Sequence, residues 1–201
     1  FVSRADNAGL NSAIALNVAS GSYAGNVKIK NDDDYFNNYF TLGNANVAFA
    51  ARNPGALGNA LKVALIANAN SSAFSTAVYQ DYFDSVPGTS AYVASNFNAN
   101  ANDEMHIVVV DRTGDWTGVP GAVLEKFAFV SKAAGAKKSD GTNNHYKDVL
   151  NSRSEYVWWM DYNPVVTNWG NVANSTDLDM LADPVSYDLS GGVDDYTMTT
   201  G

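Results

Sequence analysis

Residues 103–132 read DEMHIVVVDRTGDWTGVPGAVLEKFAFVSK, and this stretch decides the fold. The β-branched run Ile107–Val110 is typical of a strand that is buried on both faces. Thr113-Gly114-Asp115 and Pro120-Gly121 then supply turn conformations, and an apolar run resumes over residues 123–130. The arrangement predicts two paired strands, although the pattern of residues 123–130 alone fits a strand or a helix.

The rest of the chain predicts an α+β fold of mostly antiparallel β-sheet with a few short helices. A short helix is expected around residues 35–40, capped by the acids Asp32–Asp34, and another over residues 143–153, capped by Asn143 or Asn144. Further strands are expected within residues 13–18, 23–30, 47–51, 62–67, 156–160 and 185–189. Residues 68–102 form a variable, polar stretch, and residues 161–187 form a long irregular connection. The expected single core contains Ile107, Val108, Val109, Val110, Leu124, Phe127 and Val157.

Composition limits the classes of partner. The 201 residues are 46% hydrophobic, enough for a real core, and contain no cysteine, which excludes disulfides and thiolate metal sites. Because the chain has 12 basic and 21 acidic residues, for a net charge of −9, we expect no binding to nucleic acid. No apolar run approaches the roughly 20 residues that span a bilayer, and no charged-then-apolar leader opens the chain, so no membrane association is expected. The chain starts at Phe1 and ends in Thr-Thr-Gly, which suggests a segment of a longer protein.

Metal, nucleotide and nucleophilic sites are not predicted. The two histidines, His106 and His145, are far apart in sequence, and each is expected to be a surface or half-buried polar residue. No G-x-S-x-G elbow occurs. The acids at 32–34 lack the glycine and glutamate of a calcium-binding EF-hand loop, and Lys62 lacks the spacing of a phosphate loop. We therefore expect no cofactor, no metal and no catalytic residue.

One enzymatic alternative rests on a group of acids near the central strand. Asp103, Glu104, Asp111 and Asp115 could include the carboxylate pair of a glycosidase, and Trp116, Trp158, Trp159 and Trp169 could stack on sugars. The simpler interpretation is that the acids solvate strand ends and that the tryptophans fill a core of β elements.

Five stretches of this sequence, in the same order, resemble contractile tail sheath proteins of myovirus-type (T4-like) bacteriophages. They are the Asp-Glu, β-branched strand, Asp111, Thr-Gly, Pro-Gly and Val-Leu-Glu-Lys-Phe series from Asp103 to Lys132, residues 31–36 (NDDDYF), residues 51–63 (ARNPG through GN and LKV), residues 146–157 (YKD through SEYV) and residues 189–192 (LSGG). Together they span most of residues 31–192. None is specific alone, but their shared order makes coincidence improbable.

The resemblance implies a structural virion protein rather than an enzyme. Residues 1–201 would form the middle, outward-projecting domain of a sheath subunit, without the N-terminal arm and the C-terminal α/β region by which such subunits interlock. The implied partners are other sheath subunits in a helical array, the tail tube protein, and baseplate and tail terminator proteins. The implied location is the phage tail of the virion, assembled in the host cytoplasm, and the implied role is contraction around the tube during infection.

A second function class stays open. The acidic, Asn-rich, cysteine-free composition and the aromatic residues also suit a β-rich carbohydrate-binding or adhesion domain.

Overall fold

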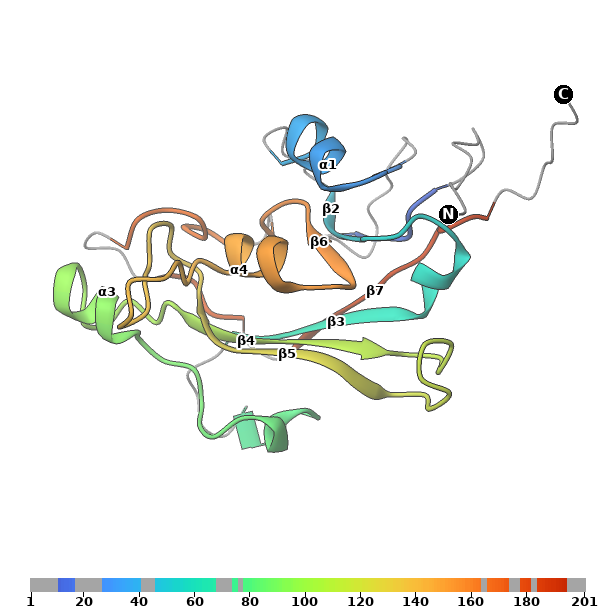
Figure 1. Cartoon of the computed structure of the whole chain (residues 1–201). Coiled ribbons are helices and arrows are strands. Elements are labelled where there is room, and N and C mark those ends of the chain that lie inside the picture. Colours follow the sequence, from blue (N-terminus) through green and yellow to red (C-terminus); the bar gives the residue numbers. More distant parts are fainter. Residues whose placement is uncertain are drawn as a thin grey trace, which may run out of the picture.

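A computed structural model describes residues 11–16, 27–40, 46–67, 74–75, 78–163, 166–173, 178–181 and 184–194. Its strands are β1 (Ile14–Leu16), β2 (Val47–Ala51), β3 (Leu61–Ile66), β4 (Glu104–Asp111), β5 (Ala122–Ser131), β6 (Val157–Trp159) and β7 (Val185–Asp188). Its α-helices are α1 (Asp32–Asn38), α3 (Ala91–Asn96) and α4 (Tyr146–Arg153), and two short 3₁₀ helices cover Ala56–Ala60 (η1) and Gln80–Tyr82 (η2). The elements are arranged in layers (Figure 1).

The strands form two antiparallel sheets, and together with the short helices they confirm the predicted α+β fold. The larger sheet has the order β5-β4-β3-β7, and the smaller has the order β1-β2-β6. In Figure 1 the larger sheet runs across the molecule, with α4 and the smaller sheet on one face and the segment that carries η2 on the other. Helix α1 covers the far side of the smaller sheet.

Strand β4 is the central strand and is buried from Met105 to Asp111. Ile107 and Val109 face the main core, which lies between the two sheets and includes α4. Val108 and Val110 face the opposite side and pack with Phe83 in a separate cluster. The prediction of one core is therefore wrong for Val108 and Val110, because successive side chains of a strand point to opposite faces. Phe127, Val157 and the partly buried Leu124 belong to the main core, as predicted.

Residues 122–131 form a strand, which settles the choice left open by the sequence. This β5 is an edge strand, and its register against β4 shifts twice, once between Met105 and Ile107 and once between Val109 and Val110. Each shift places an extra residue on β5, so both are β-bulges. In the first bulge Phe129 has a φ of +52°, a left-handed conformation that is rare for an aromatic residue.

The connection from β4 to β5 is organised by the buried carboxylate of Asp111. It accepts hydrogen bonds from the backbone N–H groups of Gly114, Trp116 and Thr117 and from the Thr117 hydroxyl, at 2.8–3.0 Å. Gly114 has a φ of +87°, and a Cβ there would lie 2.9 Å from Pro120. The turn predicted from Gly114 is thus confirmed, and Asp111 fixes its shape.

Two helix caps differ from the predicted ones. The N-cap of α1 is Asn31, whose Oδ1 accepts from the N–H of Asp34, while the three acids occupy the first turn. The N-cap of α4 is His145 rather than Asn143 or Asn144. Asn143 still contributes, because its Oδ1 accepts from the N–H of His145 and thereby shapes the turn before the helix.

The other predicted elements agree where they are described, except the strand predicted over residues 23–30. Residues 14–16 lie in β1, and residues 17–18 lie outside the described residues. Residues 27–30 carry no regular structure, so this part of the strand predicted over 23–30 is wrong. The described part of residues 68–102 includes η2 and α3. The described part of the connection predicted over residues 161–187 is irregular up to Val185, where β7 begins.

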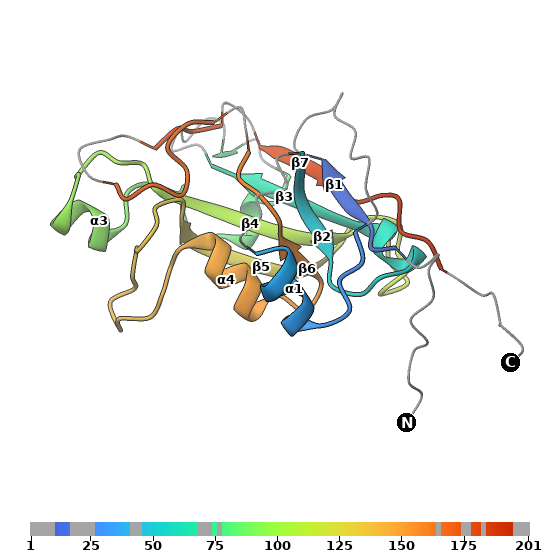
Figure 2. The same ribbon diagram turned by 90° about the horizontal axis from the view of Figure 1, so that it is seen from above.

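The segment after β7 joins the two sheets. Beyond β7, Ser190 pairs with Ile14 of β1, and Val193 pairs with Asn11 through two backbone hydrogen bonds of 3.1 and 3.2 Å. Gly192 allows this close approach, because a Cβ there would lie 2.3 Å from the carbonyl oxygen of Gly55. The two ends of the described chain therefore lie side by side (Figure 2).

Candidate functional site

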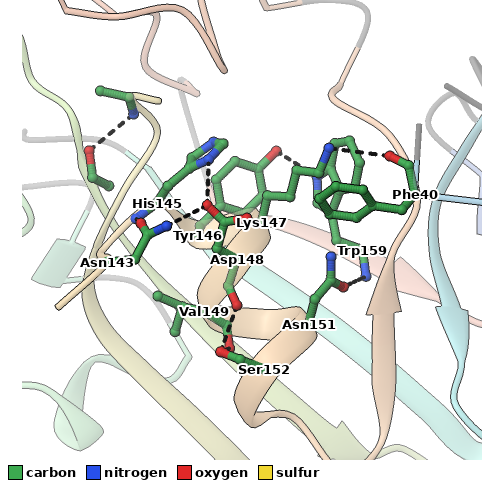
Figure 3. Close-up of polar contacts among 12 residues, drawn as sticks. Phe40, Asn143, His145, Tyr146, Lys147, Asp148, Val149, Asn151, Ser152 and Trp159 are labelled. Carbon is green, nitrogen blue, oxygen red and sulfur yellow. Dashed lines mark hydrogen bonds and ion pairs between the residues drawn. The ribbon is translucent and has the colours of Figure 1, made fainter. Parts of the chain in front are cut away.

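The first turn of α4 carries several titratable side chains that contact one another (Figure 3). The imidazole Nδ1 of His145 lies 3.4 Å from Asp148 Oδ2, which also accepts a hydrogen bond of 2.7 Å from the side chain of Asn143. The hydroxyl of Tyr162 lies 3.3 Å from His145 Nε2, and the two rings stack. Burial lowers the pKa of His145, although Asp148 opposes that shift, and burial raises the pKa of Tyr162 to about 12.

A second polar chain ties α4 to the smaller sheet and to α1. Trp159 Nε1 donates to the hydroxyl of Tyr146, and the Asn151 side chain accepts from the N–H of Trp159 and donates to the hydroxyl of Tyr35. Tyr35 in turn donates to the carbonyl oxygen of Trp159. Burial raises the pKa of both tyrosines far above the ordinary value, so they are neutral donors and acceptors at physiological pH.

Lys147 extends this network over aromatic rings. Its Nζ lies 3.9 Å from the ring centre of Phe40 and 4.2 Å from that of Trp159, and it donates to the carbonyl oxygen of Phe40. Burial lowers its pKa. The arrangement holds α4 against neighbouring elements, and neither His145 nor Asp148 lines either of the two cavities described below. These polar side chains therefore serve to pack α4 against the elements around it.

The predicted exposure of both histidines is wrong. His145 is 5% exposed, and His106 is completely buried between Phe83, which stacks on its ring at 4.1 Å, and Phe129. His106 Nε2 lies 2.8 Å from the carbonyl oxygen of Ser85, and Nδ1 accepts from the N–H of Phe129 at 3.1 Å. These two bonds require a neutral ring with its proton on Nε2, and burial correspondingly lowers its pKa.

The four acids near the central strand do not form one group. Asp103 and Glu104 stand at the start of β4, whereas Asp111 and Asp115 stand at or beyond its end. Eight strand residues span roughly 25 Å at about 3.3 Å each, far more than the separation of a glycosidase pair. Asp103 accepts from the N–H of Ser90 and the hydroxyl of Ser131, and Asp115 accepts from Thr113. Each of these carboxylates thus anchors a local turn or strand end.

The tryptophans fill the interior, as the simpler interpretation predicted. Trp158, Trp159 and Trp169 are all buried, and the partly buried Trp116 packs edge-on against Tyr156. Trp158 and Trp159 are consecutive in β6 and face different clusters.

The structure also contains two cavities that the sequence did not indicate. The larger, of about 640 Å³, is lined by residues of α3, β4, β5 and the loop before α4: Ser90, Ala91, Tyr92, Ser95, Asn96, Glu104, Ala128, Phe129, Lys137, Lys138, Ser139 and Asn144. The smaller, of about 350 Å³, is lined by Lys30, Asn31, Asp32, Arg52, Asn53, Ser154, Glu155 and Trp158. Of the larger cavity's residues, sequence analysis singled out only Glu104 for possible chemistry. The adjacent lysines Lys137 and Lys138 in an acidic chain were the signal that could have pointed to it.

Two kinds of site are absent from the part of the chain that the structure describes. No three His, Asp or Glu side chains there gather so that they could hold a metal ion. None of the helices described is both long and apolar enough to cross a membrane.

Comparison with known proteins gives one informative similarity. No family model matches the chain. Over 81 residues, or 40% of its length, the chain is 35% identical to a protein of Salmonella phage ViI named tail sheath protein. The aligned segment spans about a tenth of that protein, 10% of its length. Over those 81 residues, the chain is similar to a bacteriophage tail sheath protein.

Proposed function

We propose that this chain is a structural domain of a bacteriophage tail sheath. The observation that carries the proposal is the 35% identity over 81 residues to the tail sheath protein of phage ViI. The ordered series of motifs from residue 31 to residue 192 supports the same assignment. Partners under this proposal are other sheath subunits, the tail tube protein, and baseplate and tail terminator proteins.

The contacts of Asn11 with Val193 support a middle, outward-projecting domain. A domain whose entering and leaving strands are hydrogen-bonded to each other can join a larger subunit at one place without disturbing its fold. The rest of the domain then extends away from that place, as α3 does in Figures 1 and 2.

The role proposed is mechanical and not catalytic. In a contractile sheath, a small difference in packing free energy between two lattices is summed over many identical copies and drives the tube through the host envelope. The buried, hydrogen-bonded states of His106 and Asp111 and the separation of the strand-end acids support a structural use of these groups.

Electron microscopy of the source particles tests the proposal. Antibodies raised against residues 11–194 and coupled to gold should decorate the tail at regular intervals along its whole length, before and after contraction. Antibody that has been absorbed with the purified chain is the control. Label confined to the capsid, the fibres or the baseplate, or particles without label, would contradict the proposal.

A further inference from the structure

The larger cavity has the composition of a carbohydrate site. Its wall includes two partly buried aromatic rings, Tyr92 and Phe129, among hydroxyl, amide, carboxylate and ammonium groups. Sugars present apolar ring faces and a dense set of hydroxyls that both donate and accept, so a site for them needs rings beside donors and acceptors. An acidic peptide would use the lysines but leave most of the other polar groups unmatched.

The chain fixes one wall of this cavity at a cost in strain. Phe129 adopts a left-handed backbone in a β-bulge, a conformation that is strained for a residue other than glycine. Two buried polar side chains hold it there, because its N–H donates to His106 Nδ1 and its carbonyl accepts from the Asn144 amide at 2.8 Å. Strained residues that the surroundings hold so firmly are concentrated at binding sites.

Asn144 supports the bulge beside this cavity. It lines the cavity and is 4% exposed, and its amide donates to the carbonyl oxygen of Phe129 at 2.8 Å. Its Oδ1 has no hydrogen-bond partner among the described residues and is enclosed by the protein, so a bound sugar reaches it only if the amide group turns. Glu104 on the same wall uses one oxygen, Oε2, to accept from the N–H of Gly88, and burial raises its pKa.

Lys137 and Lys138 give the site its charge preference. Both are exposed and line the same cavity as Tyr92 and Phe129. They therefore give this cavity a local positive charge in a protein of net charge −9. A carboxylate on the sugar would pair with them.

We propose that the cavity between α3, the bulge of β5 and residues 137–144 binds an oligosaccharide that contains an acidic sugar. Helix α3, which lines the cavity, lies at the end of the molecule away from the segment that follows β7 (Figures 1 and 2). A ligand at this end would remain accessible if that other end joined a larger subunit. The binding inference itself depends only on the cavity, and it holds or fails separately from the sheath assignment.

Titration calorimetry with three probes tests this inference: a galacturonate hexamer, a neutral maltohexaose and a hexaglutamate peptide. Binding of the galacturonate hexamer at sub-millimolar concentration is expected, at least five-fold tighter than that of maltohexaose and weakened by salt. Stronger binding of hexaglutamate than of the hexamer would overturn the carbohydrate assignment. Equal binding of both sugars, or no binding of either, would overturn it as well.

Variants place the binding in this cavity. Lys137→Ala/Lys138→Ala should weaken binding of the galacturonate hexamer at least ten-fold, and Tyr92→Ala should weaken both sugars. Arg112→Ala/Lys126→Ala removes the same charge elsewhere on the exposed surface and is the matched control, because neither residue lines the cavity. An unchanged melting temperature confirms folding of the lysine variant, since Lys137 and Lys138 are exposed. Tyr92 packs partly against the cluster around Val93, so circular dichroism at the titration temperature confirms that Tyr92→Ala is folded. If the control weakens binding as much as the lysine variant, or if the site variants have no effect, the proposal is wrong.

Discussion

Val109 illustrates how strongly single positions of β4 are specified. Its side chain is fully buried in the main core, between the two sheets. Val109→Asp should lower the free energy of unfolding by about 3–5 kcal/mol, because it buries an unpaired charge. Urea unfolding followed by circular dichroism measures this loss. Val119→Asp is the control, because Val119 is 60% exposed and its replacement should cost less than about 0.5 kcal/mol.

His106 makes stability depend on pH. Burial lowers its pKa below the ordinary value of 6.5, so the unfolded chain binds a proton that the folded chain resists. The stabilisation is complete above about pH 6.5 and is lost as the pH falls below that value. Chemical denaturation between pH 7 and pH 5 should therefore show decreasing stability. His106→Phe should be less stable at pH 7, because Ser85 and Phe129 lose their partner. Its free energy of unfolding should also fall less steeply between pH 7 and pH 5. An equally steep fall would exclude His106 as the source of the pH dependence.

Lys132 makes stability depend on pH in the same direction, but in an alkaline range. It is fully buried, burial lowers its pKa to about 8, and its Nζ donates to the carbonyl oxygen of Asp179, which also accepts from Trp169 Nε1. Because the folded-state pKa is depressed, wild-type stability should rise as the pH increases from about 8 toward 10. Lys132→Met should leave stability at pH 7 unchanged or raise it by about 1–2 kcal/mol. A loss of more than about 2 kcal/mol in thermal unfolding would show that the ammonium is needed.

Among the elements, the β4–β5 hairpin depends on Asp111. Asp111→Ala would leave three backbone donors and one hydroxyl without their common acceptor. We expect a loss of about 2–4 kcal/mol in the free energy of unfolding and faster amide exchange at residues 114–117. Asp115→Asn is the control, because Asp115 is exposed and accepts only from Thr113 among its described contacts. Similar losses in both variants would contradict the special role of Asp111.

The same hairpin shows why strands and turns were easier to predict than the bulges and caps that shape them. The β-branched run of β4 and the turn residues after it identify a strand and its reversal from local chemistry alone. The bulge at Phe129 could not be predicted, because it is held by His106 and Asn144, which are distant in sequence. The caps of α1 and α4 were displaced by one or more residues for a simpler reason: each helix begins after several polar residues, any of which could cap it.

The candidate sites show the same division between local and long-range information. The two histidines were expected to be exposed because His106 stands at the approach to a strand and His145 in a short polar helix, yet both are enclosed by aromatic rings from other elements. The cavity gathers residues from four separate stretches between residues 90 and 144, so no local pattern marks it. The spacing along β4 could have shown in advance that Asp103 and Glu104 lie far from Asp111 and Asp115.

At the scale of the whole molecule, the exposed edges of the larger sheet are protected. Edge strand β5 carries two bulges, its Glu125 carboxylate accepts from Ser154 and Glu155, and Ser131 at its end pairs with His145. At the other edge, β7 has only four residues before the chain leaves the sheet to pair with β1. Bulges and short edge strands oppose strand addition by a second copy.

We therefore predict that the isolated chain is a monomer. With a net charge of −9 on each copy, identical molecules repel one another, and weak lateral contacts do not overcome that repulsion in dilute solution. Light scattering at tens of micromolar protein and moderate salt should give a mass near 21.4 kDa. Raising the salt to about 1 M screens the repulsion and so distinguishes the effect of net charge from that of the protected sheet edges. If the chain is a monomer at both salt concentrations, the protected sheet edges keep it monomeric. If it forms dimers only at high salt, charge repulsion keeps it monomeric at moderate salt. Rings or tubes at moderate salt would show that these 201 residues carry lattice contacts of their own.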